Sequence, residues 1–132
     1  MKIFESLHHV ALICSDLEKA KIFYVDILGF KIIQEIYREE RQSYKVDLEA
    51  SGVHLELFTF PDSKLRLSRP EAQGLRHLAF ASKDINYTHE YLVSKGIDCE
   101  EIRVDPHTSK KFFFCADPDQ LPIEFYESSS SL

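Results

Sequence analysis

The sequence repeats itself at an interval of 68 residues, and this repeat constrains the fold more than any other feature. SLHHVALI near the N-terminus corresponds to GLRHLAF in the middle of the chain, and LELF corresponds later to IEFY. A chain of 132 residues has room for a real core but not for two full-sized domains, so we expect two related modules. Corresponding positions carry Leu7 and Leu75, His9 and His77, Asp16 and Asp84, Leu17 and Ile85, and Glu56 and Glu124.

Each half is predicted to contain a strand, a helix and three further strands. Apolar runs bounded by turn residues indicate the strands, and apolar residues at helical spacing indicate the helix. In the first half, S-x-x-E at Ser15 to Glu18 has the spacing of a helix capping box, and Gly29 suits the helix end. The expected strands are 7–13, 31–37, 44–50 and 53–60, then 75–81, 101–104, 111–115 and 122–126; the expected helices are 17–28 and 85–95.

The predicted fold class is therefore α+β. Two tandem βαβββ modules with short hairpins are expected to form a curved, mixed but mostly antiparallel sheet with helices on one face. We expect a single domain over residues 1–132, with modules at 5–60 and 74–127. Prolines and charges mark residues 61–73 as a linker, and the polar residues 128–132 are expected to form a disordered tail.

Composition narrows the classes of partner. The formal net charge of -6 argues against nucleic acid, which requires a basic surface. No apolar run approaches the length of a membrane span, and the N-terminus lacks the layout of a signal peptide. The three widely spaced cysteines fit no zinc motif and predict reduced thiols in a cytoplasmic protein.

Two histidines and two glutamates recur at one spacing. Glu56 follows His9 by 47 residues, and Glu124 follows His77 by 47 residues. Because strand side chains alternate between faces, each histidine can share a face with its glutamate, and a pseudo-twofold relation would bring both pairs into one concave site. Two carboxylates buried together are costly unless a cation neutralises them. The sequence therefore predicts one divalent metal, with a donor set that suits zinc, nickel, cobalt, manganese or iron(II).

Other interpretations of these residues stay open at this point. A single inward histidine or glutamate in a strand is more often a hydrogen-bonded structural residue than a ligand. His8 is expected to face away from its neighbour His9, and His89 to lie on the surface of the second helix. His54 shares the face of Glu56 and is a candidate to support the ligands. The repetition of both residue types in both halves favours a metal site.

The motifs HHVAL, FYVDILGF, LELF, GLRHLAF and DPDQLPIEFYE, in this order, resemble the vicinal oxygen chelate superfamily. That superfamily includes glyoxalase I, methylmalonyl-CoA epimerase, extradiol dioxygenases and fosfomycin- or bleomycin-resistance proteins. The resemblance covers about residues 5–127 and implies a glyoxalase-like fold of paired modules around a divalent metal, often in a homodimer. The ligand order His-Glu-His-Glu is similar to glyoxalase I and implies four ligands: His9, Glu56, His77 and Glu124. The epimerase pattern tends to have Gln at the position of Glu56.

The chemistry that the resemblance implies is proton transfer. In the glyoxalase I reaction, the metal holds both oxygens of a hemithioacetal and stabilises an enediolate, while a carboxylate moves the carbon-bound proton. Glu124 and Glu56 are the candidate bases, and we favour Glu124.

Two positions depart from the bacterial glyoxalase I pattern, which has Arg and Asn residues that help to hold glutathione. Those positions are Ile13 and Phe60 here, which argues against glutathione dependence. The segments YREERQSYK and RVDPHTSKK occupy equivalent places in the two halves and are either solvated hairpin edges or an anion grip. As a grip, they would offer Arg38, Arg41, Arg103 and Lys110 to a substrate with a carboxylate or phosphate.

These patterns lead to one hypothesis and two alternatives. We predict a lyase or isomerase of the glyoxalase I type, with zinc or nickel as the preferred metal, acting on a small molecule such as an anion or a thiol adduct. We expect a cytoplasmic homodimer that binds neither nucleic acid nor membrane. The alternatives are an iron-dependent extradiol-type dioxygenase and a non-catalytic protein that sequesters a drug.

Overall fold

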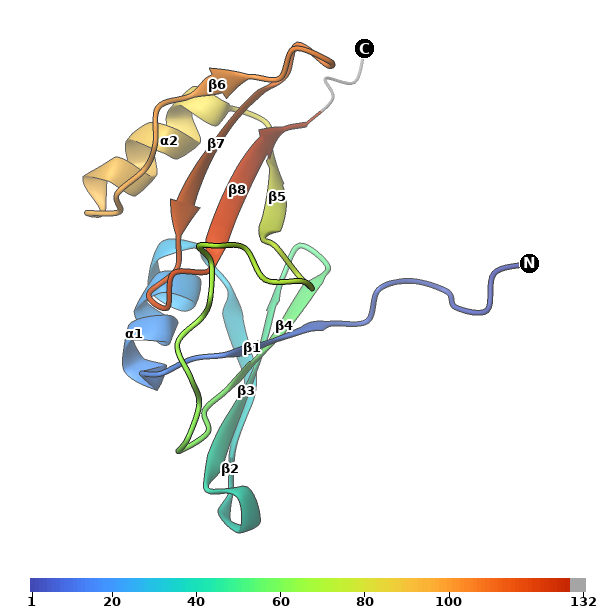
Figure 1. The fold of residues 1–132 in the computed structure, drawn as a ribbon, viewed down its shortest axis with the longest axis vertical. Coiled ribbons are helices and arrows are strands. Elements are labelled where there is room, and N and C mark those ends of the chain that lie inside the picture. The colour runs from blue at the N-terminus through green and yellow to red at the C-terminus, as the bar shows by residue number, and fades with distance from the viewer. Residues whose placement is uncertain (129–132) are drawn as a thin grey trace. The chain divides into compact units, whose positions relative to one another are not determined.

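The computed structural model in Figure 1 describes residues 1–128 and divides the chain into two compact units, Met1–Lys64 and a second unit that begins at Leu65. Most of the expected linker, residues 65–73, belongs to the second unit. Of the tail expected at 128–132, residues 129–132 lie outside the described residues.

The first unit contains a four-stranded sheet with the strand order β1-β4-β3-β2. Only the pairing of β1 with β4 is parallel; the other two pairings are antiparallel. Ser51 and Gly52 join β3 to β4 with φ angles of 49° and 78°, as the two-residue hairpin turn requires. The strands are β1 (Val10–Ile13), β2 (Lys31–Arg38), β3 (Ser43–Ala50) and β4 (Val53–Phe58).

The predicted helix of the first unit and its start at Leu17 are confirmed, but its capping residue and its second half differ from the prediction. It consists of α1 (Leu17–Lys21), which continues as a π-helical segment, η1 (Ile22–Ile27). The capping residue is Asp16 rather than Ser15: the backbone N–H of Lys19 donates to Asp16 Oδ1 at 3.1 Å. The sequence also did not predict the short 3-10 helix η2 (Glu39–Arg41), which connects β2 to β3.

The second unit repeats this topology with the strand order β5-β8-β7-β6. Again the pairing of the first strand with the last is parallel and the others are antiparallel. The elements are β5 (Leu78–Ser82), α2 (Ile85–Ser94), β6 (Arg103–Val104), β7 (Lys111–Ala116) and β8 (Pro122–Glu127). The α+β class and the two βαβββ modules are thus confirmed.

Each sheet turns one face into a core, and the other face carries a glutamate from its last strand in the chain. On β4, Leu55 and Leu57 are buried while Glu56 between them is half-buried, and on β8 the same holds for Glu124 between its neighbours. This alternation is what the period of a strand requires. It places both glutamates on the face opposite the core. The buried apolar residues are Cys14, Ala20, Phe23, Tyr24, Phe30, Val46, Leu48, Leu55 and Leu57 in the first unit, and Ile85, Leu92, Phe113, Cys115, Leu121, Ile123 and Phe125 in the second.

The cap of α2 gives a stability prediction. The backbone N–H of Tyr87 donates to Asp84 Oδ1 at 3.0 Å, which satisfies one of the free donors of the first turn. Asp84→Ala is expected to lower the free energy of unfolding by about 1 kcal/mol in urea titrations. Lys83→Ala, at the exposed neighbouring position, is the control and should change it by no more than a few tenths of that.

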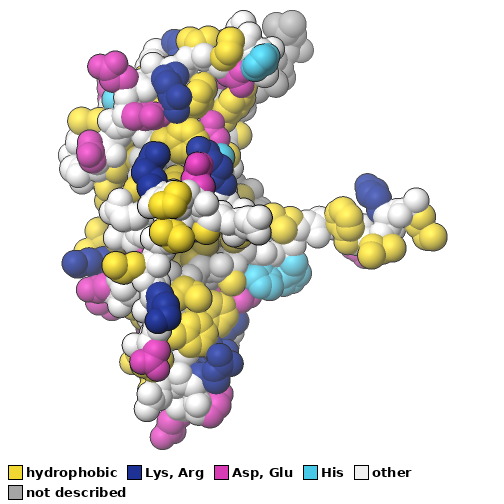
Figure 2. All heavy atoms as spheres, viewed as in Figure 1, with side chains coloured by type: hydrophobic (Ala, Val, Ile, Leu, Met, Phe, Trp, Pro, Cys, Tyr) yellow, Lys and Arg dark blue, Asp and Glu magenta, His cyan; other side chains and the backbone are white. Residues whose placement is uncertain are grey.

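The charged residues of the sequence are distributed over the surface. Acidic and basic side chains are interspersed over the face of each unit that is visible in Figure 2. Among residues 1–128, no helix combines the length and hydropathy that a membrane span requires.

Candidate active site

Glu56 on β4 lies beside His9, which directly precedes β1. The parallel pairing of these strands places Ala11 opposite Glu56, and His9 comes two residues earlier on the same side. His9 Nε2 is 3.4 Å from Glu56 Oε1. The side chains are 37% and 18% exposed, so a ligand can reach both.

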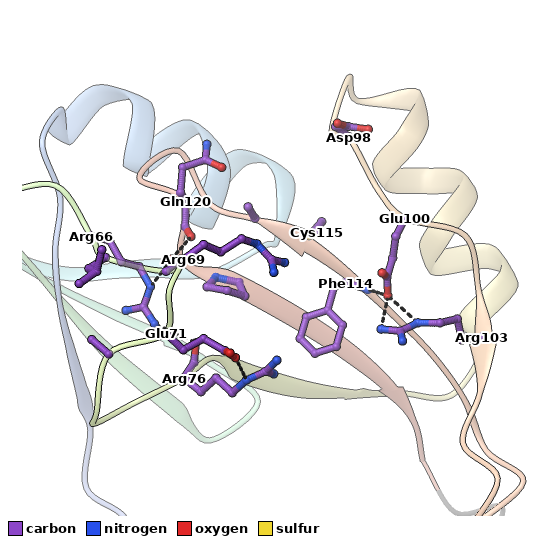
Figure 3. Close-up of a pocket in the computed structure, with 15 residues that line it drawn as sticks. Arg66, Arg69, Glu71, Arg76, Asp98, Glu100, Arg103, Phe114, Cys115 and Gln120 are labelled. Carbon is purple, nitrogen blue, oxygen red and sulfur yellow. Dashed lines mark hydrogen bonds and ion pairs between the residues drawn. The ribbon is translucent and has the colours of Figure 1, made fainter.

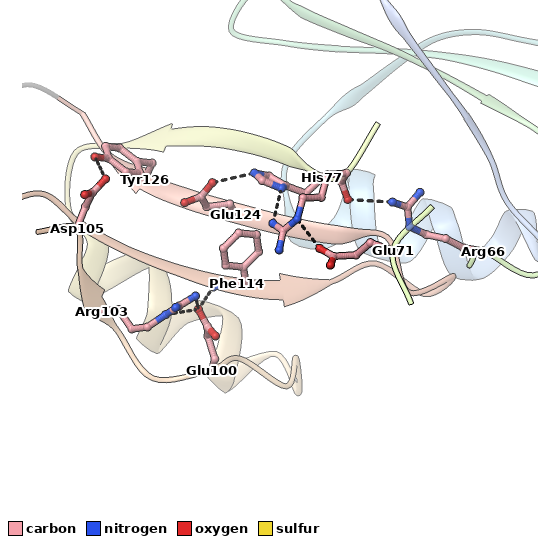
Figure 4. Close-up of polar contacts among 10 residues, drawn as sticks. Arg66, Glu71, His77, Glu100, Arg103, Asp105, Phe114, Glu124 and Tyr126 are labelled. Carbon is pink, nitrogen blue, oxygen red and sulfur yellow. Dashed lines mark hydrogen bonds and ion pairs between the residues drawn. The ribbon is translucent and has the colours of Figure 1, made fainter. Parts of the chain in front are cut away.

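The second unit builds the same contact from the same register. Ala79 on β5 lies opposite Glu124 on β8, and His77 precedes Ala79 by two residues. His77 Nε2 is 3.1 Å from Glu124 Oε1, and the two side chains are 25% and 14% exposed (Figure 4). The structure therefore pairs each predicted histidine with its predicted glutamate.

Both histidines lie before their strands rather than within them, which corrects the predicted strand starts. β1 begins at Val10 and β5 at Leu78. The alternation of faces does not extend to His8, which was expected to point away from His9. Instead the two rings meet edge to face with centroids 5.1 Å apart, and their Nδ1 atoms are 2.9 Å apart.

The residue before each histidine contacts its Nδ1 atom, and the two contacts differ chemically. His8 Nδ1 can accept a hydrogen bond from the Nδ1–H of His9, which leaves His9 Nε2 available as a metal ligand. Arg76, at the corresponding position, lies with Nη1 3.2 Å from His77 Nδ1. An arginine can only donate, so His77 Nδ1 accepts and Nε2 carries the proton toward Glu124. Sequence reasoning missed Arg76, although the 68-residue repeat aligns it with His8.

This contact predicts that Arg76 weakens metal binding. A histidine that binds a cation through Nε2 carries its proton on Nδ1 and donates it to an acceptor, which a guanidinium does not offer. Arg76→Gln supplies an amide oxygen as acceptor and removes a positive charge, so we expect divalent affinity to rise about tenfold. Competition with a chromophoric chelator measures it. Lys83→Gln removes the same charge elsewhere in the unit; an equal gain there would contradict the explanation.

The two glutamates have different neighbours. Lys45 Nζ lies 3.9 Å from Glu56 Oε2 and 2.8 Å from Asp47 Oδ1, so Glu56 belongs to a small charge network. Glu124 faces Phe114 across the β7–β8 pair instead, and the Phe114 ring also packs edge-on against His77 with centroids 5.0 Å apart. Within residues 1–128, His77 is the ion-pair partner of Glu124.

The proposed anion grip of the first unit is organised by aromatic rings. The guanidinium of Arg38 lies 4.9 Å from the Phe58 ring centroid and donates to Ser43 Oγ at 3.0 Å. Arg41 lies 5.2 Å from the Phe60 ring, which stacks on Phe58. Ile13 pairs with Phe58 and is 57% exposed. These residues share the face of Glu56 and form an apolar surface with guanidinium groups above it.

In the second unit, Arg103 is bound rather than free. Its guanidinium donates to Glu100 Oε1 at 2.9 Å and lies 4.7 Å from the Phe112 ring. The segment that carries Lys110 is fixed by Tyr126, whose hydroxyl donates to Asp105 Oδ2 at 3.0 Å (Figure 4). The backbone N–H of His107, together with this hydroxyl, lowers the pKa of Asp105.

The remaining histidines have other surroundings. His89, expected on the surface of α2, is half-buried: its Nε2 is 2.9 Å from the Glu100 carbonyl oxygen, and its ring packs on Phe113. It therefore holds the segment before β6 to the helix. His54 lies opposite Glu49 on the exposed end of β4.

Two of the three cysteines are unsuited to nucleophilic chemistry. Cys14, Cys99 and Cys115 form no disulfide among the described residues. Burial, with smaller effects from Cys99, raises the pKa of Cys115 to about 12, and burial also raises the pKa of Cys99. At neutral pH both therefore stay protonated, and a thiol is a far weaker nucleophile than a thiolate.

A metal would find two donor pairs in the chain. No group of three or more His, Cys, Asp or Glu side chains within residues 1–128 is gathered as a metal site. Each pair presents one imidazole and one carboxylate, which are borderline N/O donors suited to the divalent ions predicted above. The donor chemistry of each pair therefore fits a divalent cation.

The sequence matches the Glyoxalase/Bleomycin resistance protein/Dioxygenase superfamily over residues 6–125. The chain therefore belongs to this family, as its motifs predicted.

Several relatives extend this result. The chain is 56% identical to the uncharacterized protein YwkD of Bacillus subtilis (strain 168), over 95% of this chain and 98% of that protein. The crystal structure of a glyoxalase family protein from Enterococcus faecalis matches with a TM-score of 0.91 and 42% identity, covering 96% of this chain and 100% of that one. Two epimerases are more distant. Human mitochondrial methylmalonyl-CoA epimerase is 29% identical over 81% of this chain and 64% of the enzyme. The 2-epi-5-epi-valiolone epimerase of an Actinomyces species is 26% identical over 90% of this chain and 77% of the enzyme.

Proposed function

We propose that the protein is a divalent-metal-dependent enzyme of the glyoxalase I type, which moves a proton next to a carbonyl group of a small substrate. One observation carries this proposal: the same His–Glu contact recurs in both units, with Nε2–Oε1 distances of 3.4 Å and 3.1 Å. In both units the contact lies on the sheet face opposite the core, where the imidazole and the carboxylate stay accessible to a ligand.

In this proposal the metal is held by His9, Glu56, His77 and Glu124, with zinc or nickel preferred. The set can be completed within one chain or between the chains of a homodimer, which we expect to be the functional form. When bound, a divalent cation acts as a Lewis acid that polarises a carbonyl and makes the neighbouring C–H bond easier to deprotonate.

Glu124 is the proposed base. To reach a substrate proton, a carboxylate must turn away from its present partners. Glu124 would break only its contact with His77, whereas Glu56 would break its contacts with both His9 and Lys45. Glu124 Oε1 can take the proton from carbon and return it to the neighbouring carbon of the same substrate. Phe114 beside it limits the approach of water on the β7 side.

The surface near Glu56 argues against glutathione. Ile13 and Phe60 stand where the glutathione-dependent pattern has polar residues, and Phe60 stacks on Phe58. Such a surface favours a substrate with an apolar portion, while Arg38 and Arg41 above the rings can attract an anionic group.

A second candidate is an epimerase. It is favoured by the two relatives named as epimerases. The chemistry begins in the same way, with removal of a proton next to a carbonyl, and differs in the return of the proton to the opposite face of the same carbon.

Metal analysis and proton NMR in D2O test these proposals. The purified protein is assayed with zinc, nickel, cobalt or manganese, first on methylglyoxal with glutathione or another thiol and then on methylmalonyl-CoA. We expect metal-dependent turnover of a thiol adduct other than glutathione. Deuterium uptake with inversion of methylmalonyl-CoA would instead support the epimerase. Oxygen consumption with iron on a catechol would support the dioxygenase, and tight drug binding without metal would support the sequestering protein.

A further inference from the structure

The second unit contains a cavity of about 590 Å³ that includes Arg103 of the predicted grip but neither His77 nor Glu124. Its walls come from the segment 66–76, the approach to β6, and β7 with the turn that follows it (Figure 3). This volume lies within the range of small-molecule sites.

The cavity is rich in guanidinium groups, and one of them, Arg69, acts on a neighbouring carboxylate only through its charge, which helps to lower the pKa of Glu71. Arg76 donates to Glu71 at 2.8 Å, and Arg103 donates to Glu100 at 2.9 Å. Arg69 has neither a hydrogen bond nor an ion pair among the described residues, and Figure 3 shows it reaching over the cavity from the linker. In a chain of net charge -6, the donors of Arg69 are therefore available to an anion, whereas those of Arg76 and Arg103 are partly occupied by carboxylates.

The wall that carries Arg69 is fixed by its neighbour Arg66. Arg66 Nη2 donates to the carbonyl oxygens of Leu75 and Arg76 at 3.0 Å and 2.9 Å. Arg66 Nε donates to Ser68 Oγ at 3.0 Å. These bonds close residues 66–76 into a loop, so the backbone that carries Arg69 is held in place.

We propose that this cavity binds an oxyanion, either a carboxylate or a phosphate, with Arg69 as its anchor. A guanidinium presents two parallel N–H donors that match the paired oxygens of either group. Arg76 and Arg103 in the walls are already paired with Glu71 and Glu100, so Arg69 is the better anchor.

The position of the cavity points to the substrate class of the candidate active site. Arg76 and Phe114 line the cavity and also contact His77, at 3.2 Å to Nδ1 and 5.0 Å between ring centroids. A small acid or phosphate ester held by Arg69 would thus extend toward the His77–Glu124 pair. This step rests on the proposed function, whereas oxyanion binding does not.

Anion titrations of the metal-free, full-length protein test the inference. Inorganic phosphate and succinate are added separately while amide NMR shifts are followed. We expect saturable shifts in residues 66–76 with at least one of the two anions, and the tighter one identifies the class. Arg69→Gln should raise its Kd about tenfold or more. Ala72→Glu, which adds a carboxylate to the wall, should raise it similarly without touching Arg69.

Lys83→Gln is the matched control, because it removes one positive charge from the same unit outside the cavity, and its Kd should stay within about twofold of the parent. Absence of saturable shifts with both anions, or equal weakening by the control, would overturn the inference. Metal binding is measured separately, so the two proposals can fail independently. Phosphate or succinate binding by a protein that binds no divalent metal would defeat the proposed function alone. Metal binding by a protein that binds neither anion would defeat this site alone.

Discussion

Glu124→Gln is expected to lower the rate of substrate proton exchange by about 10³-fold, within the range that general bases contribute. Glutamine keeps the size and an oxygen of the side chain but cannot accept the proton. Glu124 is paired with His77 at 3.1 Å and faces Phe114, so little else in its surroundings can replace it. The rate is measured by deuterium uptake from D2O into the substrate that the assays identify.

Glu56→Gln is the matched variant and should reduce that rate by no more than about tenfold, since outer contacts and weaker ligands cost about this much. The epimerase pattern of this family tends to have glutamine here, which supports the tolerance. Equal losses in both variants would contradict a unique role for Glu124. A greater loss in Glu56→Gln would make Glu56 the base.

His77→Ala is expected to weaken divalent binding at least about 100-fold, beyond the effect typical of outer-sphere changes. It removes one of two imidazoles and leaves Glu124 without its 3.1 Å partner. Chelator competition with zinc measures the affinity, and circular dichroism checks that the variant is folded.

His107→Ala is the control for this experiment, because it removes an exposed histidine from the turn before β7. Its affinity for zinc should match that of the parent. Retention of parental affinity in His77→Ala would show that the metal, if bound, uses other ligands.

The repeat explains why so much of the fold could be predicted. The spacing of 68 residues relates each element of the second unit to one of the first, so the sequence pattern of each element occurs twice and each copy supports the other. Alternation on β4 and β8 placed Glu56 and Glu124 opposite the core, since Leu55 and Ile123 beside them are buried.

The structure differs from the predictions just outside the strands and helices, where the alternation of a strand or the spacing of a helix cap no longer determines where a side chain lies. His8 was assigned a face by alternation, but β1 begins only at Val10, so its ring is free to meet His9. Ser15 fits the capping box by spacing, yet Asp16 is the residue whose side chain accepts the bond. Ser15 and Asp16 are both common capping residues, and only the backbone geometry shows which of them caps the helix.

Side-chain contacts between segments that are distant in the chain could not be predicted from the sequence. The pairing of Arg66 with carbonyls of Leu75 and Arg76, which shapes the cavity, follows from the path of the linker and not from any motif. Arg69 likewise stands out only because its neighbours in space are already paired. No periodicity in a single sequence carries that information.

X-ray diffraction from crystals grown with zinc or nickel, with anomalous data at the metal edge, tests the central claim most directly. We predict one anomalous peak per chain, bonded to His9, Glu56, His77 and Glu124, whether one chain or two supply them. The account would be contradicted by metal bound to a single pair or to other residues, in a crystal where neither one chain nor two neighbouring chains bring the two pairs together.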